Sequence, residues 1–307
     1  FSGLEEKLPA DFFNMFKAVN DPDFPWTGII FGAPIIAFWY WCTDQYIVQR
    51  LFSAKSINDA RRGTLLAAFL KVLPIFILVL PGLIAVALYP EIKGDEAYSA
   101  LVAGDLLPIG LKGIVVAGLL AAIMSSLAGA FNSTAVLFTN DFYKTRNPHA
   151  NERKLVLVGR LTTTAVVVAA ILIVPLVKII SSQIYLFLQS VQAFVSPPIT
   201  AVFLFGLFSK KINSKTALIT LIVGETIGFS RLLLEIFSNL GVQLHPVLIW
   251  ILGINFLHFA IFLFVVSISL ILVLNFYSIR VTNEFMISIK YSISESIQEL
   301  KYNFANI

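Results

Sequence analysis

The sequence predicts an all-α polytopic membrane protein, and two observations lead to this fold class. Hydrophobic residues make up 58% of the 307 residues and charged residues only 13%, whereas a soluble domain carries about 25% charged residues. The apolar residues gather in runs longer than the roughly 18 residues that cross a bilayer. These runs do not alternate apolar with polar residues, and lipid forces each segment to satisfy its own backbone, so we expect helices and not strands.

Seven such runs are expected to form membrane spans. The third carries no charge from Gly113 to Asn140, and the fifth carries none from Ile179 to Ser209. A short surface helix is expected within 94–110, ahead of the third span. The seven spans cover about residues 26–48, 64–89, 113–139, 154–178, 183–208, 215–238 and 247–277.

The basic residues predict the orientation in the membrane. Lys and Arg gather in the loops after the first, third and fifth spans, whereas the loop 91–105 is acidic. Basic loops stay in the cytoplasm, so we expect the chain to start outside the cell and the tail 278–307 to lie inside. A nucleic-acid surface is not favoured, because the basic residues are split among short loops.

Proline interrupts two of the expected spans. Gly32 and Pro34 lie in the first span, and Pro197 with Pro198 lies in the fifth. Proline lacks an N–H and crowds the preceding turn, so we expect both helices to break there. Spans interrupted by Gly and Pro are typical of transporter binding sites, although proline kinks without a function are also common.

The stretch AFWYWCTDQYIVQR, residues 37–50, becomes polar within an apolar run. Tyr40 and Trp41 have apolar rings with polar tips, a combination that suits a sugar, which offers CH faces and hydroxyl groups. The alternative is an aromatic belt at the membrane interface, with Asp44 and Arg50 simply leaving the membrane. Cys42, the single cysteine, lies within this span and forms no internal disulfide.

Polar side chains also occur inside the second and fifth expected spans. Lys71 is costly within a membrane and is a candidate site residue; alternatively, it extends towards the cytoplasmic surface. Gln189 and Gln192 lie one turn apart, and buried amides need partners. A ligand with several hydroxyl groups would satisfy them, and so would a neighbouring helix.

Small residues in the third span suggest a cation site. Ala122, Ser125 and Ser126 share one helix face, and hydroxyl and carbonyl oxygens are hard ligands that suit such ions. The alternative is close packing of helices through small residues.

Other polar residues in the spans are interpreted as structural. We expect Glu225, Arg231 and Glu235 to form an internal ion pair or an interface, and His258 to be a hydrogen-bonded packing residue. No zinc-ligand spacing, phosphate-binding loop or Ser/His/Asp set occurs, so the sequence does not predict an enzyme.

Three stretches together resemble the sodium/solute symporter family, and most closely its sodium/glucose cotransporter branch. The resemblance extends to about residue 277, and the first stretch is the most specific. They are WYWCTDQYIVQRLFSAKSINDARRGTLLAAFLK, MSSLAGAFNSTAVLFTNDFYK and LQSVQAFVSPPITAVFLFGLFSKKIN, in this order.

This resemblance implies a leucine-transporter-type fold with two inverted five-helix repeats. Residues 26–208 would be the second repeat, 209–277 two peripheral helices, 1–25 an extracytoplasmic loop and 278–307 a cytoplasmic tail. The first repeat would lie upstream, so the chain is expected to be a fragment. The implied sugar-binding residues are Tyr40, Trp41, Lys71 and Gln189, and the implied sodium ligands are Ala122, Ser125 and Ser126.

The implied function is sodium-coupled symport of a glucose- or galactose-like sugar across the plasma membrane by alternating access. The partners would be the sugar, Na+ as coupling ion, the lipid bilayer and the missing N-terminal helices. One departure is Ala37, where relatives often carry a polar residue. Alternatives are symport of inositol, an organic acid or an amino acid, and a sensor or membrane-embedded enzyme built on this scaffold.

Overall fold

The computed structural model describes residues 2–92, 94–104, 106–180, 183–209 and 212–276. This part of the chain is helical, and its β-structure is limited to an isolated bridge between Lys17 and Pro25. The N-terminal segment contains α1 (Ser2–Glu5) and the 3-10 turn η1 (Ala10–Phe13). The predicted tail 278–307 lies outside the described residues.

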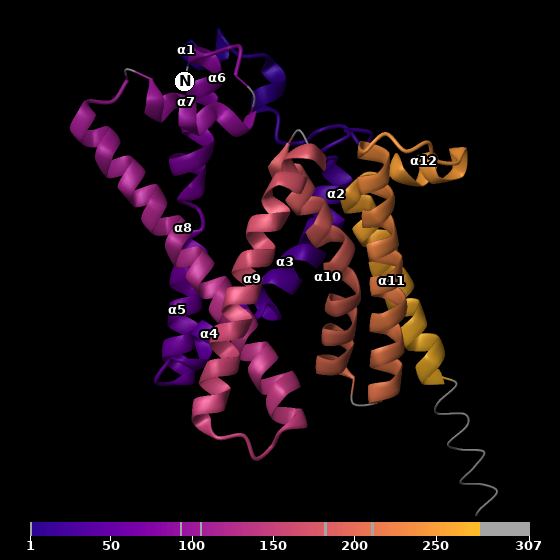
Figure 1. Ribbon diagram of the computed structural model, residues 1–307. Coiled ribbons are helices and arrows are strands. Elements are labelled where there is room, and N and C mark those ends of the chain that lie inside the picture. The colour runs from indigo at the N-terminus through magenta and orange to yellow at the C-terminus, as the bar shows by residue number, and fades with distance from the viewer. Residues whose placement is uncertain (1, 93, 105, 181–182, 210–211, 277–307) are drawn as a thin grey trace, which may run out of the picture.

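The described chain has six helices that are long and apolar enough to cross a membrane, and a bent helix pair makes a seventh candidate span. This confirms the predicted fold class of an all-α polytopic membrane protein. Its helices lie roughly side by side, and the short α7 and α12 lie at one end (Figure 1).

The first span is interrupted at Gly32, as predicted, but its sharp bend comes later in the chain. α2 (Trp26–Phe31) and α3 (Ala33–Cys42) are followed by α4 (Gln45–Phe52), which is inclined by 45° to the helices before it. Pro34 lies in the first turn of α3, where a missing N–H costs little. The chain bends instead at Thr43–Asp44, because the Asp44 carboxylate caps α4 by accepting a bond from the Tyr46 N–H.

The second span is continuous in direction but irregular in its middle. It comprises α5 (Ile57–Leu70), the π-helical turn η2 (Ile75–Val79) and α6 (Leu80–Leu88). It begins before the predicted residue 64, because Ser56 caps α5 through the Asp59 N–H. Lys71 follows α5 directly, at the interruption that precedes Pro74.

The following helices match the predicted runs closely. The short helix expected within 94–110 is present as α7 (Ala97–Ala103), preceded by the turn η3 (Gly94–Glu96). After it come α8 (Ile109–Leu137), its π-helical continuation η4 (Phe138–Lys144), α9 (Glu152–Ile180), α10 (Ile184–Phe208) and α11 (Ser214–Asn239).

Two expectations about helix breaks were wrong. α10 continues through Pro197 and Pro198. The Phe194 carbonyl, four residues before Pro198, loses its donor in the helix and lies instead against Gly228 of α11. The expected span 247–277 is divided into α12 (Pro246–Leu252) and a helix Phe256–Phe276, because Asn255 caps the second helix through the Leu257 N–H.

The buried core joins α3, α10, α11 and the helix Phe256–Phe276. Gly32 is required at the contact of the broken span with the last helix, because a Cβ there would meet the Leu257 carbonyl. By contrast, the most apolar windows of α8 and α9 bury none of their residues. The core cluster consists of Ile36, Ala193, Phe194, Leu257, Phe259, Ala260 and Leu263.

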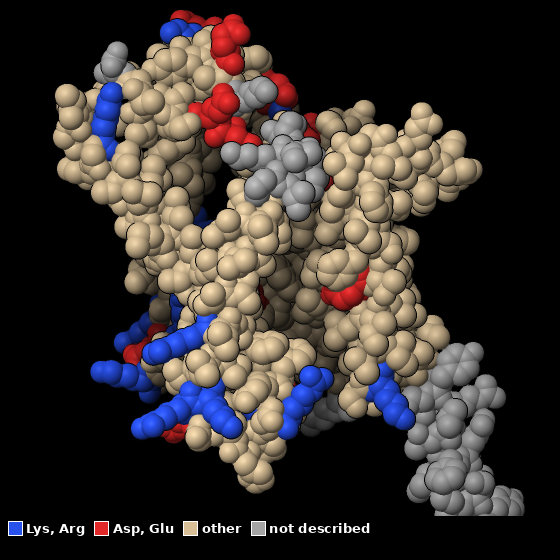
Figure 2. Space-filling view, in the orientation of Figure 1, with Lys and Arg blue, Asp and Glu red and all other residues tan. Residues whose placement is uncertain are grey.

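The charged side chains separate along the helix direction. Lys and Arg gather mainly at the end formed by α4 and the connection between η4 and α9, while Asp and Glu lie mainly at the end with α1, α6 and α7 (Figure 2). This is the arrangement that a cytoplasmic and an outer surface would show. We therefore name the acidic end the outer end.

Candidate functional site

A cavity of about 550 Å³ lies between the broken span and α10. It brings together Tyr40, Lys71 and Gln189, which are far apart in the sequence and which we singled out as candidate ligand-binding residues. Its remaining lining residues are Phe24, Ile29, Ala33, Ile36, Ala37, Tyr185, Gln192, Phe256 and Leu257.

Helix geometry explains how each polar group reaches this cavity. On α3, residues 33, 36, 37 and 40 recur at the spacing of one helix face. On α10, residues 185, 189 and 192 do the same. Lys71 lies where α5 ends, so a charged residue from the middle of a span enters the cavity at a helix interruption.

α10 is also attached to α3 on the side of this cavity. The Thr200 hydroxyl donates a 3.1 Å hydrogen bond to the Ile35 carbonyl, and both residues are buried. The Phe38 and Phe203 rings meet nearby at 5.9 Å. The broken span and the double-proline helix therefore share one packed interface, with the cavity at its edge.

Trp41 has a different position from the other three candidates. It does not line the cavity, and 38% of its surface is exposed. The Lys71 ammonium lies 5.6 Å from the centre of its ring, and the Tyr40 ring meets it edge-on at 5.3 Å. Trp41 therefore supports two lining residues from outside, with a cation–π contact to Lys71.

Ala122, Ser125 and Ser126 lie on α8 and are exposed in the described structure. They do not line the cavity, so the chain described here does not bring the two sets of predicted residues together. α8 does use small residues for packing, but at later positions. The Gln49 amide of α4 donates to the Ser133 hydroxyl at 2.9 Å, and Gly129 leaves space for the Tyr46 ring.

Three aromatic residues of the cavity were not predicted from the sequence. Phe24, Tyr185 and Phe256 meet at ring distances of 6.5 Å for Phe24–Tyr185 and 6.1 Å for Phe24–Phe256. Tyr185 could have been found, since it lies one turn before Gln189. Phe24 and Phe256 come from a loop and from a helix start, and no local pattern indicates that they are neighbours.

The structural interpretation of the remaining polar residues is largely confirmed. Arg231 pairs with Glu235 at 3.5 Å, and the side chain of Arg231 is only 5% exposed. The ring of His258 is hydrogen-bonded through Nε2 to Thr27 at 2.7 Å. Glu225 does not join the ion pair, and neither of its carboxylate oxygens has a hydrogen-bond partner among the described residues.

The fold and the cavity define a class: a polytopic helical membrane protein with a largely apolar cavity, which a few polar side chains enter, beside a broken span. The comparison with protein families shows which family within this class the chain belongs to. A family model described as "Sodium:solute symporter family" matches residues 4–224. The chain belongs to this family.

Curated relatives agree with this assignment. A sodium/mannose cotransporter of Bos taurus is 39% identical over 84% of this chain and 47% of its own length. Sodium/glucose cotransporter 1 of Sus scrofa is 36% identical over 94% of this chain and 47% of its own. Sodium/myo-inositol cotransporter 2 of Mus musculus is 40% identical over 73% of this chain and 36% of its own. The chain thus spans about half the length of these relatives or less.

Proposed function

We propose that the complete protein, of which this chain is a part, is a plasma-membrane symporter that couples sodium entry to the uptake of a sugar. The observation that carries the proposal is the convergence of Tyr40, Lys71 and Gln189 on one cavity beside the broken span. An ammonium group, a phenol and an amide offer donors and acceptors to hydroxyl groups, and the surrounding rings offer apolar faces.

The exposed apolar faces support the view that further helices complete the protein. The most apolar windows of α8 and α9 bury none of their residues, and that of the second span buries 6%. We propose that residues 26–208 form one five-helix repeat, that an inverted counterpart upstream covers these faces, and that residues 209–277 form the peripheral helices. This chain alone is then not expected to transport.

Ala122, Ser125 and Ser126 are proposed to contribute to the sodium site. Their exposed position on α8 leaves room for ligands from another segment of the complete protein. The sodium gradient would then drive uptake by alternating access, with the broken span moving against its neighbours. A potential of 100 mV gives about 2.3 kcal/mol per charge, which corresponds to accumulation of tens-fold.

Uptake of labelled solute by cells that express the complete protein tests this function. We expect uptake of glucose or galactose to fall to background when sodium is replaced. Equal uptake with and without sodium would overturn the proposed coupling. Cells that do not express the protein serve as the control, and their uptake of the labelled solute defines the background.

The alternative is that the protein transports a solute other than glucose or galactose. The relatives named for mannose and myo-inositol are the reason to test these two solutes directly. A competition panel of unlabelled glucose, galactose, mannose and myo-inositol against each labelled solute decides between them. We expect glucose and galactose to compete best. Stronger competition by myo-inositol would transfer the proposal to the polyol.

A further inference from the structure

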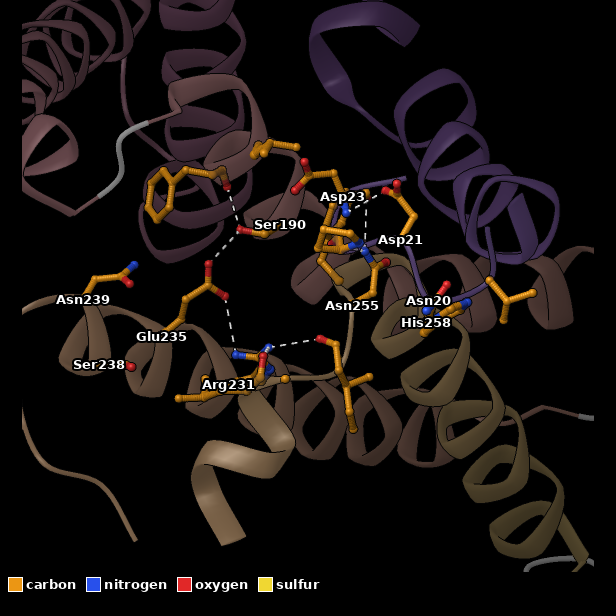
Figure 3. Close-up of a pocket in the computed structure, with 18 residues that line it drawn as sticks. Asn20, Asp21, Asp23, Ser190, Arg231, Glu235, Ser238, Asn239, Asn255 and His258 are labelled. Atoms are coloured by element: carbon orange, nitrogen blue, oxygen red, sulfur yellow. Dashed lines mark hydrogen bonds and ion pairs between the residues drawn. The ribbon is translucent and has the colours of Figure 1, made fainter. Parts of the chain in front are cut away.

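A second cavity, of about 780 Å³, lies towards the outer end of the molecule (Figure 3). It is formed by the loop 19–23, the first turns of α10, the last turns of α11 and the segment 252–258. In Figure 3, Ser190 and Glu235 lie across the cavity from Asp21, Asn255 and His258. None of its polar groups belongs to the set proposed for the sugar.

The single guanidinium of this cavity is already occupied by the protein. Nη2 of Arg231 donates to the carbonyls of Leu252 at 2.9 Å and Ile254 at 3.3 Å, and Nη1 faces Glu235. The guanidinium also lies 5.2 Å from the Phe194 ring. Only Nε lacks a hydrogen-bond partner in the described structure, so one donor of a nearly buried side chain stays unsatisfied.

The carboxylates of the cavity, by contrast, can accept further hydrogen bonds. The contacts of Glu235 are long, 3.4 Å to the Ser190 hydroxyl and 3.5 Å to Arg231, although a carboxylate can accept about four hydrogen bonds. The Asp23 carboxylate accepts no hydrogen bond from any described residue. Asp21 uses one oxygen for the Asp23 and Phe24 N–H groups. The cavity therefore has an excess of negative charge and of acceptors.

These groups select a class of ligand. No group of three or more His, Cys, Asp or Glu residues in the described chain could hold a metal ion, and the volume is within the range of small-molecule sites. We propose that the outer cavity binds a small amino alcohol. Its ammonium group would donate to the Asp23 and Glu235 carboxylates, and its hydroxyl group would donate to the second carboxylate oxygen of Asp21, which accepts no hydrogen bond from the described residues.

The outer cavity shares a wall with the inner one. Phe256 lines both cavities, and Ser190 of the outer cavity follows Gln189 of the inner one. The loop that carries Asp23 leads into α2, whereas Glu235 lies on α11. A ligand that joins them would hold the broken span against α11. This expectation rests on the proposed function: with the ligand bound in the outer cavity, transport should be slower, while the affinity for the transported solute should be unchanged.

Binding is tested with tris(hydroxymethyl)aminomethane, which is an ammonium with three hydroxyl groups at neutral pH. The purified complete protein in lipid nanodiscs is titrated calorimetrically in an amine-free buffer without sugar. Pentaerythritol, which replaces the ammonium by a fourth hydroxymethyl group, and tert-butylammonium, which lacks hydroxyl groups, are the matched probes. We expect each to bind about tenfold more weakly, since each loses a hydrogen bond to a charged group.

Two variants assign the binding to this cavity. Asp23→Asn, on a loop, should weaken tris(hydroxymethyl)aminomethane about tenfold, because it removes one charged acceptor. Glu91→Gln, an exposed acid towards the same end, should leave binding unchanged. Absent binding, equal binding of pentaerythritol, or binding unaffected by Asp23→Asn would overturn the site. The titration needs no transport, so a failure of sodium-dependent uptake would overturn the proposed function and not this site.

Discussion

The Thr27 hydroxyl and Nε2 of His258 lie 2.7 Å apart, although 231 positions separate them in the sequence. This hydrogen bond joins α2 to the helix Phe256–Phe276. Asn255 adds a second connection, since its amide donates to the carbonyls of Pro22 at 2.7 Å and Asp23 at 3.1 Å. The first half of the broken span is therefore attached to the last described helix at its outer end.

Thr27→Val should lower the thermal stability of the complete protein. The substitution keeps the size of the side chain but leaves His258 without its partner, at a cost of about 1 kcal/mol. The measurement is the melting temperature of the purified protein in detergent. Thr64→Val is the control, because that exposed hydroxyl bonds only to the Ala60 carbonyl of its own helix. An unchanged melting temperature for Thr27→Val would contradict the role of this contact.

Gln189→Leu should raise the solute concentration for half-maximal uptake. The amide lines the inner cavity, and loss of one or two hydrogen bonds to a hydroxylated solute corresponds to about tenfold weaker binding. The measurement is the concentration dependence of uptake at saturating sodium. Gln243→Leu changes an exposed residue outside both cavities and should behave like the unaltered protein. A normal concentration dependence for Gln189→Leu would remove the inner cavity as the substrate site.

Ser126→Ala should raise the sodium concentration for half-maximal uptake several-fold, because it removes one oxygen from the proposed sodium site. The assay varies sodium at a fixed, saturating solute concentration. Ser269→Ala is the matched control, since that exposed hydroxyl bonds to the Val265 carbonyl of its own helix. If both variants keep their sodium dependence, the serines of α8 serve only packing and the ion binds elsewhere.

The helices and the interruption at Gly32 were predicted from the sequence, whereas the other interruptions were not. Apolar length alone predicts where a membrane helix lies, because lipid leaves the backbone few alternatives. A local proline rule failed at Pro197–Pro198, because the freed Phe194 carbonyl is accommodated by Gly228 on a neighbouring helix. The break at Thr43–Asp44 depends on the Asp44 cap, whereas the predicted span 26–48 runs through these residues without a break.

Some residues of the candidate site could likewise be predicted from the sequence, whereas others could not. Lys71 and Gln189 were selected because polar groups are costly inside apolar helices, and Tyr40 because its ring and hydroxyl group suit a sugar. All three line one cavity. Phe24 and Phe256 could not be selected, since 232 positions separate them and their contact exists only in the packed protein. The sodium residues stay a prediction, because α8 is exposed in the described chain.

Gly228→Ala should destabilise the contact between α10 and α11. A Cβ at this position would collide with the Phe194 carbonyl, a backbone atom that cannot move away independently. Overpacking of this kind costs about 1–3 kcal/mol. Gly206→Ala, at a position of α10 with open space, should leave stability unchanged or raise it by up to about 1 kcal/mol. Equal melting temperatures for the two variants would contradict the close approach of the helices.

Glu225→Leu should raise the thermal stability of the complete protein. Both carboxylate oxygens are buried and have no hydrogen-bond partner in the described part of the chain, and such a group costs about 1–3 kcal/mol. Glu235→Leu is the instructive comparison, because it leaves the buried Arg231 without its counter-charge and should destabilise the protein by about 3–5 kcal/mol. The measurement is again the melting temperature. A loss of stability in Glu225→Leu would mean that another segment of the complete protein pairs with this carboxylate, and crosslinking from a cysteine at position 225 would then locate it.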